Sequence, residues 1–179
     1  MKHSFALGLS TLGLALAAAG NSQIAIGPFV GADQESFDLL VPGSYGAFVG
    51  FAGAGTFVKF GGALGALVVN NAAATLNPRS VANDMYGLNA NVKITFSQVR
   101  HRFGGYFRTP ALAGVPTQMF VAFYRAGVLV GVKVGAPVDG LAWRWRGWDV
   151  TGLGGYDEVR ITGNAAAPGK VGMDDLQVD

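Results

Sequence analysis

The chain has 179 residues, which is enough for one ordinary domain with a buried core. Its 13 basic and 11 acidic residues nearly cancel. The sequence therefore lacks the clustered positive charge that nucleic-acid binding requires. It has no cysteine, which excludes a disulfide framework, a thiolate metal site and a lipid anchor attached to cysteine.

The first twenty residues have the pattern of a secretory signal peptide. Lys2 and His3 form a short polar start, residues 5–16 are almost entirely apolar, and Ala17-Ala18-Ala19 supplies small residues for cleavage. The apolar run is too short to cross a bilayer. We therefore predict a signal peptide over residues 1–20 and a single β-sandwich domain over residues 21–179. The expected location is secreted or extracellular, with the periplasm as the alternative.

From residue 23 onward, apolar residues alternate or form short blocks between clusters of Gly, Asn, Pro and Ser, and the chain contains 28 glycines. Many short strands at this spacing favour an all-β fold, an antiparallel β-sandwich of the jelly-roll type. The predicted strands are Gln23–Ile26, Ser36–Val41, Ala47–Phe51, Thr56–Phe60, Leu64–Val69, Val92–Ser97, Phe103–Arg108, Gln118–Arg125, Leu129–Val134, Leu141–Val150, Asp157–Thr162 and Val171–Val178.

The sequence predicts the conformation of three connections between strands. The stretch from Tyr124 to Val128 is typical of a tight hairpin turn, with Gly127 available for a positive φ. The segment Asn70–Asp84 is the longest without a strand pattern and predicts a surface loop or a single helical turn. The last two strands flank the turn-forming segment Asn164–Gly169, which is the pattern of a β-hairpin.

Two adjacent carboxylates interrupt the last predicted strand. Simple alternation places Asp174 on one face with Leu176 and Val178, and Asp175 on the other face with Met173, so one carboxylate must point towards apolar neighbours. A buried carboxylate must be hydrogen-bonded, paired or bound to metal.

If the first and last strands are neighbours, Asp174 and Asp175 converge with Glu35 and Asp38. Such an arrangement predicts a structural Ca²⁺ site completed by backbone carbonyls. Two alternatives remain. One carboxylate caps backbone N–H groups at a β-bulge, or it pairs with Arg160.

Aromatic and basic residues alternate in a second constellation near residue 145. Trp143 and Trp145 share one strand face, and Arg144 and Arg146 share the other. Exposed indoles stack on sugar rings, and nearby polar groups hydrogen-bond to the hydroxyls. Alternatively, the tryptophans face the sandwich core and the arginines face water, which the alternation favours. The candidate ligand-binding residues are Trp143, Arg144, Trp145, Arg146, Trp148 and Asp149.

The sequence offers little for catalysis. His101 is the only histidine after processing and stands between two arginines, where it is more typical of an exposed strand residue than of a general base. One histidine cannot form a zinc site. A carboxylate pair of the kind used by glycan hydrolases has no fixed spacing in sequence. We therefore predict a protein that is not an enzyme, with a carboxylate-dependent glycan hydrolase as a remote alternative.

Several short motifs together resemble a recurring type of secreted bacterial jelly-roll module, which often precedes a PEP-CTERM sorting tail. The motifs are Phe37-Asp38-Leu39-Leu40-Val41-Pro42, Ile94-Thr95-Phe96-Ser97, Phe103-Gly104-Gly105-Tyr106-Phe107, Phe120-Val121-Ala122-Phe123-Tyr124, Tyr156-Asp157-Glu158-Val159-Arg160-Ile161 and Gly172-Met173-Asp174-Asp175-Leu176. The resemblance implies a sandwich fold similar to galactose-binding-like domains and carbohydrate-binding modules, some of which hold a structural Ca²⁺. No Pro-Glu-Pro motif follows Val178, so free secretion or a truncated gene is the expectation.

The function expected from these features is that of a secreted, non-catalytic binding module. Its predicted partner is a polysaccharide or another component of a cell surface or matrix. The alternative is a structural protein of an extracellular matrix or filament, which the Gly/Ala-rich strands favour.

Overall fold

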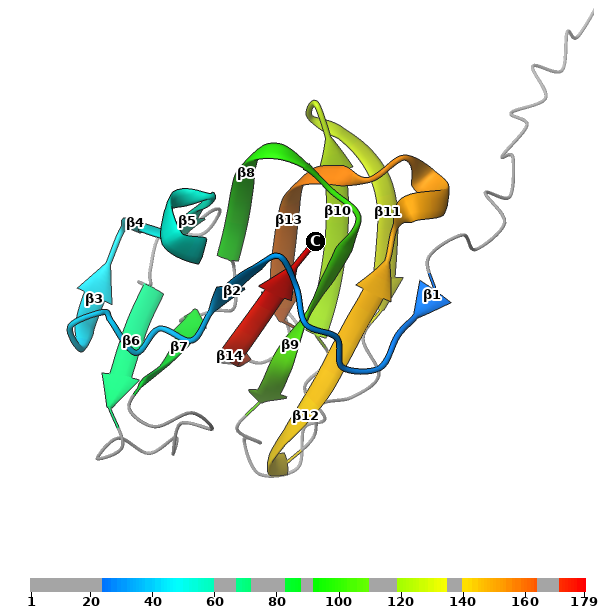
Figure 1. Ribbon diagram of the computed structural model, residues 1–179. Helices are drawn as coiled ribbons and strands as arrows, with labels where there is room; N and C mark the ends of the chain where they lie inside the picture. Colours follow the sequence, from blue (N-terminus) through cyan, green and yellow to red (C-terminus); the bar gives the residue numbers. More distant parts are fainter. Residues whose placement is uncertain are drawn as a thin grey trace, which may run out of the picture.

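The computed structural model describes residues 24–59, 67–71, 83–87, 92–109, 119–134, 140–163 and 171–179. These residues form two antiparallel β-sheets that face each other across one hydrophobic core, as Figure 1 shows. The predicted signal peptide lies outside the described residues.

The larger sheet lies at the front of Figure 1. Its path in spatial order is β1 (Ile24–Ala25), β12 (Gly140–Asp149), β9 (Arg102–Thr109), β14 (Val171–Val178), β7 (Asn83–Gly87), β6 (Leu67–Asn71) and β3 (Gly43–Tyr45), and β2 (Asp33–Glu35) also pairs with β14. One of the early strands, β2, borders the last strand, with Glu35 aligned with Leu176, so the condition on which the predicted carboxylate cluster depended is met by β2, whereas β1 pairs with β12.

The smaller sheet lies behind the larger one. In spatial order it contains β11 (Val128–Val134), β10 (Met119–Arg125), β13 (Tyr156–Gly163), β8 (Val92–Arg100), β5 (Gly55–Lys59) and β4 (Ala47–Gly50). Two single-turn 3₁₀ helices, η1 (Phe51–Gly53) and η3 (Thr151–Leu153), follow β4 and β12.

Alternation of apolar and polar residues explains how the strands of the smaller sheet face the core. In β10, Met119, Val121 and Phe123 are buried while the residues between them are half-buried. Such a period of two buries one side of each strand. Aromatic rings fill much of the space between the sheets, for example Phe103, which stacks on Trp148 with an interplanar angle of 12°. Such pairs add about 0.5–1.5 kcal/mol beyond the area that they bury.

The predicted all-β class and antiparallel sandwich are confirmed. The jelly-roll connectivity stays a prediction. No helix in the described residues is both long and apolar enough to span a membrane.

The predicted C-terminal hairpin is wrong. β13 belongs to the smaller sheet, where it pairs with β10 and β8. β14 belongs to the larger sheet, where it pairs with β9, β7 and β2. The chain therefore crosses from one sheet to the other between these strands. Both strands carry apolar residues at strand spacing, and the sequence pattern does not distinguish a partner in the same sheet from one in the opposite sheet.

The predicted strand Ser36–Val41 is also wrong. Phe37 has a left-handed φ of 62°, and the Leu40 N–H donates to the Phe37 carbonyl at 3.0 Å. The chain therefore turns at Phe37, whose ring is fully buried, while Leu39 is fully exposed. β7, which begins inside the expected loop Asn70–Asp84, and the short strand β3 were not predicted.

The predicted turn after β10 is confirmed. Ala126 and Gly127 both have positive φ values, 49° and 78°, which matches the twist of a two-residue hairpin. The Asp157 carboxylate accepts a hydrogen bond from the Ala126 N–H at 2.9 Å. This contact ties the turn to the neighbouring strand β13.

Candidate functional site

A β-bulge in β14 resolves the apparent conflict between the adjacent carboxylates and the apolar strand. Asp174 pairs with Tyr106 of β9, but the next paired residue, Gln177, lies opposite Gly104, so β14 has one extra residue here. Asp175 takes a left-handed φ of 47°, and its N–H donates to the Asp174 carboxylate at 2.8 Å. This arrangement is the predicted alternative in which a carboxylate caps the backbone at a bulge.

The bulge also changes which residues share a face. Met173, Leu176 and Val178 are all fully buried in the core between the sheets. Asp174 lies on the outer face with Tyr106, and yet it is 0% exposed. The expected alternation, in which Leu176 and Val178 share the face of Asp174, is therefore wrong because the extra residue reverses the pleat.

Glu35 holds the backbone of two residues beside β14 by hydrogen bonds. Its carboxylate accepts hydrogen bonds from the Phe37 N–H at 2.7 Å and the Phe51 N–H at 2.8 Å. Both phenylalanines have positive φ values and fully buried rings. Glu35 thus holds two left-handed backbone positions whose side chains fill the core. Arg160, the other predicted partner of the β14 carboxylates, lies in the smaller sheet, where its Nε donates to Glu158 at 2.5 Å.

The structure brings only some of the four predicted metal ligands close to one another. β2 brings Glu35 beside β14, and Asp38 follows in the turn after Phe37. Among the described residues, no group of three or more His, Cys, Asp or Glu side chains is arranged to hold a metal ion. Calcium binding by Glu35, Asp38, Asp174 and Asp175 stays a prediction.

Trp143 and Trp145 lie on the outer face of the larger sheet, away from the core. Trp148 aligns with Phe103, and both are buried between the sheets. Trp145 is three residues earlier on the regular part of β12 and aligns with Tyr106, so it points the opposite way. The expectation that alternation buries these two tryptophans is therefore wrong, while their predicted separation from Arg144 and Arg146 is confirmed.

Glycines on neighbouring strands give the outer rings room to lie against the sheet. A Cβ atom at Gly104 of β9 would lie 2.6 Å from Trp145 Cζ2. A Cβ atom at Gly172 of β14 would lie 3.4 Å from Trp143 Cη2 and 3.3 Å from Arg108 Cγ. Trp143 therefore reaches from β12 across β9 to β14, with Arg108 against one face of its ring.

Arg108 and Trp143 form a cation–π contact, with Arg108 Cζ 4.5 Å from the centre of the indole. The arginine is only 4% exposed, whereas Trp143 is half-buried. On the same face, Tyr106 meets Trp145 edge-on, with ring centres 5.3 Å apart. We call Trp143, Trp145 and Tyr106 the outer aromatic row. All three side chains retain some contact with solvent.

The remaining predicted ligand-binding residues have different positions. Trp148 is 4% exposed and belongs to the core, so its assignment to a binding surface is wrong. Arg144 is exposed and Arg146 is half-buried, both on the opposite face of β12 from the row. The Asp149 carboxylate accepts from the Thr151 N–H at 2.8 Å, which begins η3. This hydrogen bonding to Thr151 lowers the pKa of Asp149, and the nearby Arg102 and His101 lower it further.

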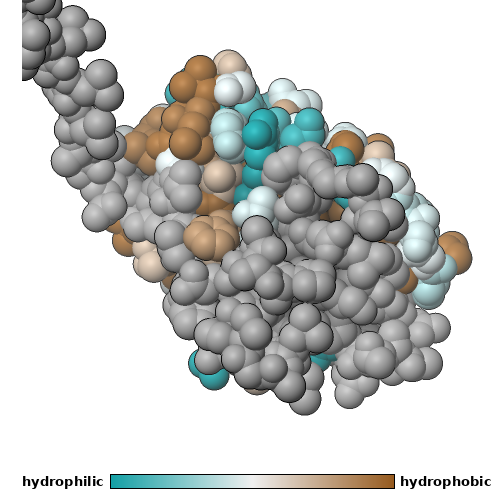
Figure 2. Space-filling view, turned by 180° about the vertical axis from the view of Figure 1, so that it is seen from behind, coloured by the Kyte–Doolittle hydropathy of each residue, from teal (hydrophilic) through white to brown (hydrophobic). Residues whose placement is uncertain are grey.

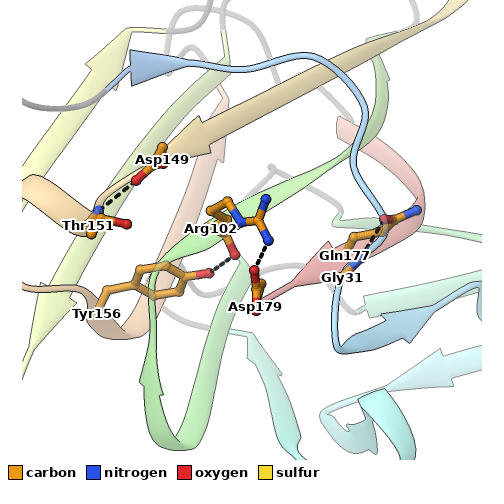
Figure 3. A network of polar contacts seen from close by, with 7 residues as sticks. All are labelled: Gly31, Arg102, Asp149, Thr151, Tyr156, Gln177 and Asp179. Carbon is orange, nitrogen blue, oxygen red and sulfur yellow. Dashed lines mark hydrogen bonds and ion pairs between the residues drawn. The ribbon is translucent and has the colours of Figure 1, made fainter.

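A polar network closes the end of the sandwich near residue 102 (Figure 3). The Arg102 guanidinium pairs with the Asp179 carboxylate. The Tyr156 hydroxyl donates to the Arg102 carbonyl at 2.8 Å, and burial raises the pKa of Tyr156 well above its ordinary value. His101 is exposed in the turn between β8 and β9. These contacts join the last residue of the chain to the turn and to β13.

The outer face of the smaller sheet has a different character. Figure 2 views the molecule from behind and shows a hydrophilic band flanked by apolar surface. Arg160 lies 4.0 Å from the ring centre of Tyr124 there and contacts Glu158. At the sheet edge, Val128 and Leu129 of β11 are 67% and 50% exposed. The larger sheet alone therefore combines outward tryptophans with a glycine-lined floor in the described residues.

Two solved structures share this fold. The K2 cleaved adhesin domain of Lys-gingipain (Kgp) is 16% identical, with a TM-score of 0.55 over 82% of this chain and 98% of that domain. The arabinose-bound α-L-arabinofuranosidase MgGH51 is 11% identical, with a TM-score of 0.50 over 83% of this chain and 27% of the enzyme. No protein-family profile matches the chain, nor does any curated protein. At such identities the likeness shows the fold alone.

Three residues of the outer face were not among the predicted ligand-binding residues. Tyr106 and Arg108 alternate with buried Phe107 in β9, so their outward position follows once the core side of β9 is known. Phe29 contacts Trp145 from a segment outside any strand. The sequence carries a weak signal for the first two, in the glycines at positions 104 and 105, but none for Phe29.

Proposed function

We propose that this domain is an extracellular, non-catalytic carbohydrate-binding module whose binding face is the outer aromatic row. The observation that supports this proposal is the outward orientation of Trp143 and Trp145 on β12, opposite to buried Trp148. Aromatic side chains that gather on one outer sheet face and keep some contact with solvent offer apolar surface to a ligand.

A sugar fits this face by its chemistry. A pyranose or furanose ring has apolar C–H surfaces that stack on an indole, while its hydroxyls need a few placed polar groups. Trp143 offers a half-buried ring that Arg108 supports from one face. Tyr106 adds a half-buried phenol beside Trp145. A ring that is held in place by its neighbours in this way loses little side-chain entropy when a ligand binds.

The burial of Asp174, which is aligned with Tyr106 of the row, supports a binding role over hydrolysis. Asp174 lies opposite Tyr106 but is 0% exposed, and it accepts a backbone hydrogen bond from Asp175. A hydrolase of the common type needs two carboxyl groups that reach the scissile bond. The likeness to an adhesin domain and to part of an arabinofuranosidase concerns the fold, and the proposal rests on the outer row.

The proposal is tested by pull-down on insoluble arabinoxylan, cellulose and chitin, followed by titration with the polysaccharide that retains the protein. Trp143→Ala is expected to weaken binding at least about tenfold, which corresponds to about 1.4 kcal/mol. Arg144→Ala is the matched control, because Arg144 is exposed on the same strand but on the opposite face. No retention on any of the three, or equal retention of both variants, would contradict the proposal.

A second candidate function is structural assembly, and the edge of the smaller sheet favours it. Among the described strands, β11 lies at one edge of the smaller sheet, its sequence is Val-Leu-Val-Gly-Val-Lys-Val, and its Val128 and Leu129 are exposed. Such edges promote strand pairing between chains. Light scattering on a concentration series tests this function. Association that Leu129→Lys abolishes would support assembly, and a monomer at every concentration would contradict it.

A further inference from the structure

The segment between β1 and β2 crosses the outer face of the larger sheet. Figure 1 shows this blue segment passing in front of the sheet from β12 towards β14. At one end, the Ile26 N–H donates to the Gly147 carbonyl of β12 at 3.0 Å. At the other end, the Gly31 N–H donates to Gln177 Oε1 of β14 at 3.0 Å (Figure 3). We call residues 26–31 the crossing segment.

Two glycines hold the crossing segment in close contact with the sheet. A Cβ atom at Gly147 would lie 3.0 Å from the Ile26 carbonyl oxygen. A Cβ atom at Gly31 would lie 2.4 Å from the Val178 carbonyl oxygen. The approach at Gly31 leaves no room for a side chain and the approach at Gly147 is tight, so the backbone of the segment lies directly on β14 and β12. A ligand therefore cannot pass between the crossing segment and the sheet at these two points.

The crossing segment also contacts one end of the outer aromatic row. The Trp145 Nε1–H donates to the Ile26 carbonyl at 3.1 Å. The Phe29 ring meets Trp145 edge-on, with centres 5.8 Å apart and planes at 87°. Arg102 Cζ lies 4.8 Å from the centre of the same Phe29 ring. Trp145 is thus fixed by two residues of the segment, and Trp143 lies farther along β12 on the side of Trp145 away from Gly147.

We propose that the crossing segment closes one end of the binding face, so that the domain recognises the end of a carbohydrate chain. This inference rests on the proposed function and adds the class of ligand to it. Phe29 is the stop, because it lies beside Trp145 at the closed end of the row. Val30, the next residue, is 81% exposed and takes no part in the contact with Trp145. An internal stretch of a polysaccharide would have to continue through this position, whereas a terminal sugar unit does not.

The test compares two pools of the polysaccharide that the pull-down identifies among arabinoxylan, cellulose and chitin. One pool is intact and the other is partially hydrolysed, so that it has about ten times more chain ends at equal mass. The expected mass concentration for half-saturation is about tenfold lower for the hydrolysed pool. Equal half-saturation for the two pools would overturn the inference and leave the proposed function intact. Absence of any Trp143-dependent binding would overturn both.

Two variants test whether the Phe29 ring sets the preference for chain ends. Phe29→Ala is expected to bind the intact pool as tightly per mass as the hydrolysed pool, because the closed end is opened. Val30→Ala is the matched control and should keep the preference for chain ends, since its exposed side chain lies beside the stop. Near-ultraviolet circular dichroism confirms that both variants are folded. A Phe29→Ala protein that keeps the full preference would overturn the assignment of the Phe29 ring as the stop.

Discussion

The guanidinium of Arg108 lies against the indole of Trp143, with Cζ 4.5 Å from the ring centre. The two residues come from neighbouring strands, and the arginine is almost fully buried beneath a ring that remains half-buried. Asp174 is 0% exposed on the next strand and the same outer face. Arg108 pairs in register with Gly172, so the two charged residues are diagonal neighbours. Long side chains in diagonal positions are within reach of each other.

Loss of the Arg108 charge should destabilise the domain. Arg108→Met leaves the buried Asp174 carboxylate without its diagonal cation, and we expect the free energy of unfolding to fall by roughly 3–5 kcal/mol. Urea denaturation measures this change. Asp174→Asn in the Arg108→Met background is expected to recover part of the loss, because neither of these two charges then remains. Strictly additive effects of the two substitutions would contradict coupling between these side chains.

Trp148 and Trp143 should differ sharply in their contributions to stability. Trp148→Ala removes a core ring that stacks on Phe103 and is expected to lower the free energy of unfolding by about 3–5 kcal/mol. Trp143→Ala alters the half-buried outer surface and should lower it by less than half as much. Urea denaturation of both variants provides the comparison. A larger effect at position 143 would contradict the assigned faces of β12.

Tyr156 should resist ionisation in the folded protein. Burial raises the pKa of its hydroxyl well above the ordinary value of 10.0. The buried hydroxyl favours its neutral form, so the contribution of Tyr156 to the stability of the fold is fully present below pH 10. This contribution is lost as the pH rises above 10 towards the pKa of the folded state. Ultraviolet titration near pH 11 should detect one ionised tyrosine fewer in the folded protein than in urea. Tyr156→Phe is expected to abolish the difference, and an unchanged difference would assign it to another tyrosine.

Calcium binding has a direct thermal test. If Ca²⁺ joins Glu35 and Asp38 to Asp174 and Asp175, EDTA should lower the Tm and added Ca²⁺ should restore it, because a ligand that binds only the folded state stabilises it. Asp38→Asn should remove the response to both reagents. An unchanged Tm would leave hydrogen bonding to the backbone as the role of Glu35 and Asp174.

The sequence alone determined the class of fold and most of the strands. Strict alternation, as in Val92-Lys93-Ile94-Thr95-Phe96, predicts a strand with one buried side, and β8 has this pattern. Local turn chemistry was equally informative at Ala126-Gly127, where two positive φ values close the hairpin. Both signals act within a few residues of the chain. They do not depend on which strand lies next to which.

Only the tertiary structure decided which strand faces point outward. The bulge at Asp174-Asp175 reverses the pleat, and nothing in the local pattern distinguishes a bulged strand from a regular one. The outward position of Trp143 and Trp145 follows from the alignment of β12 with β9, which places Trp148 opposite Phe103. Phe29 reaches Trp145 across more than a hundred residues of sequence. Such contacts depend on sheet order and register, which arise from the packing of the whole chain.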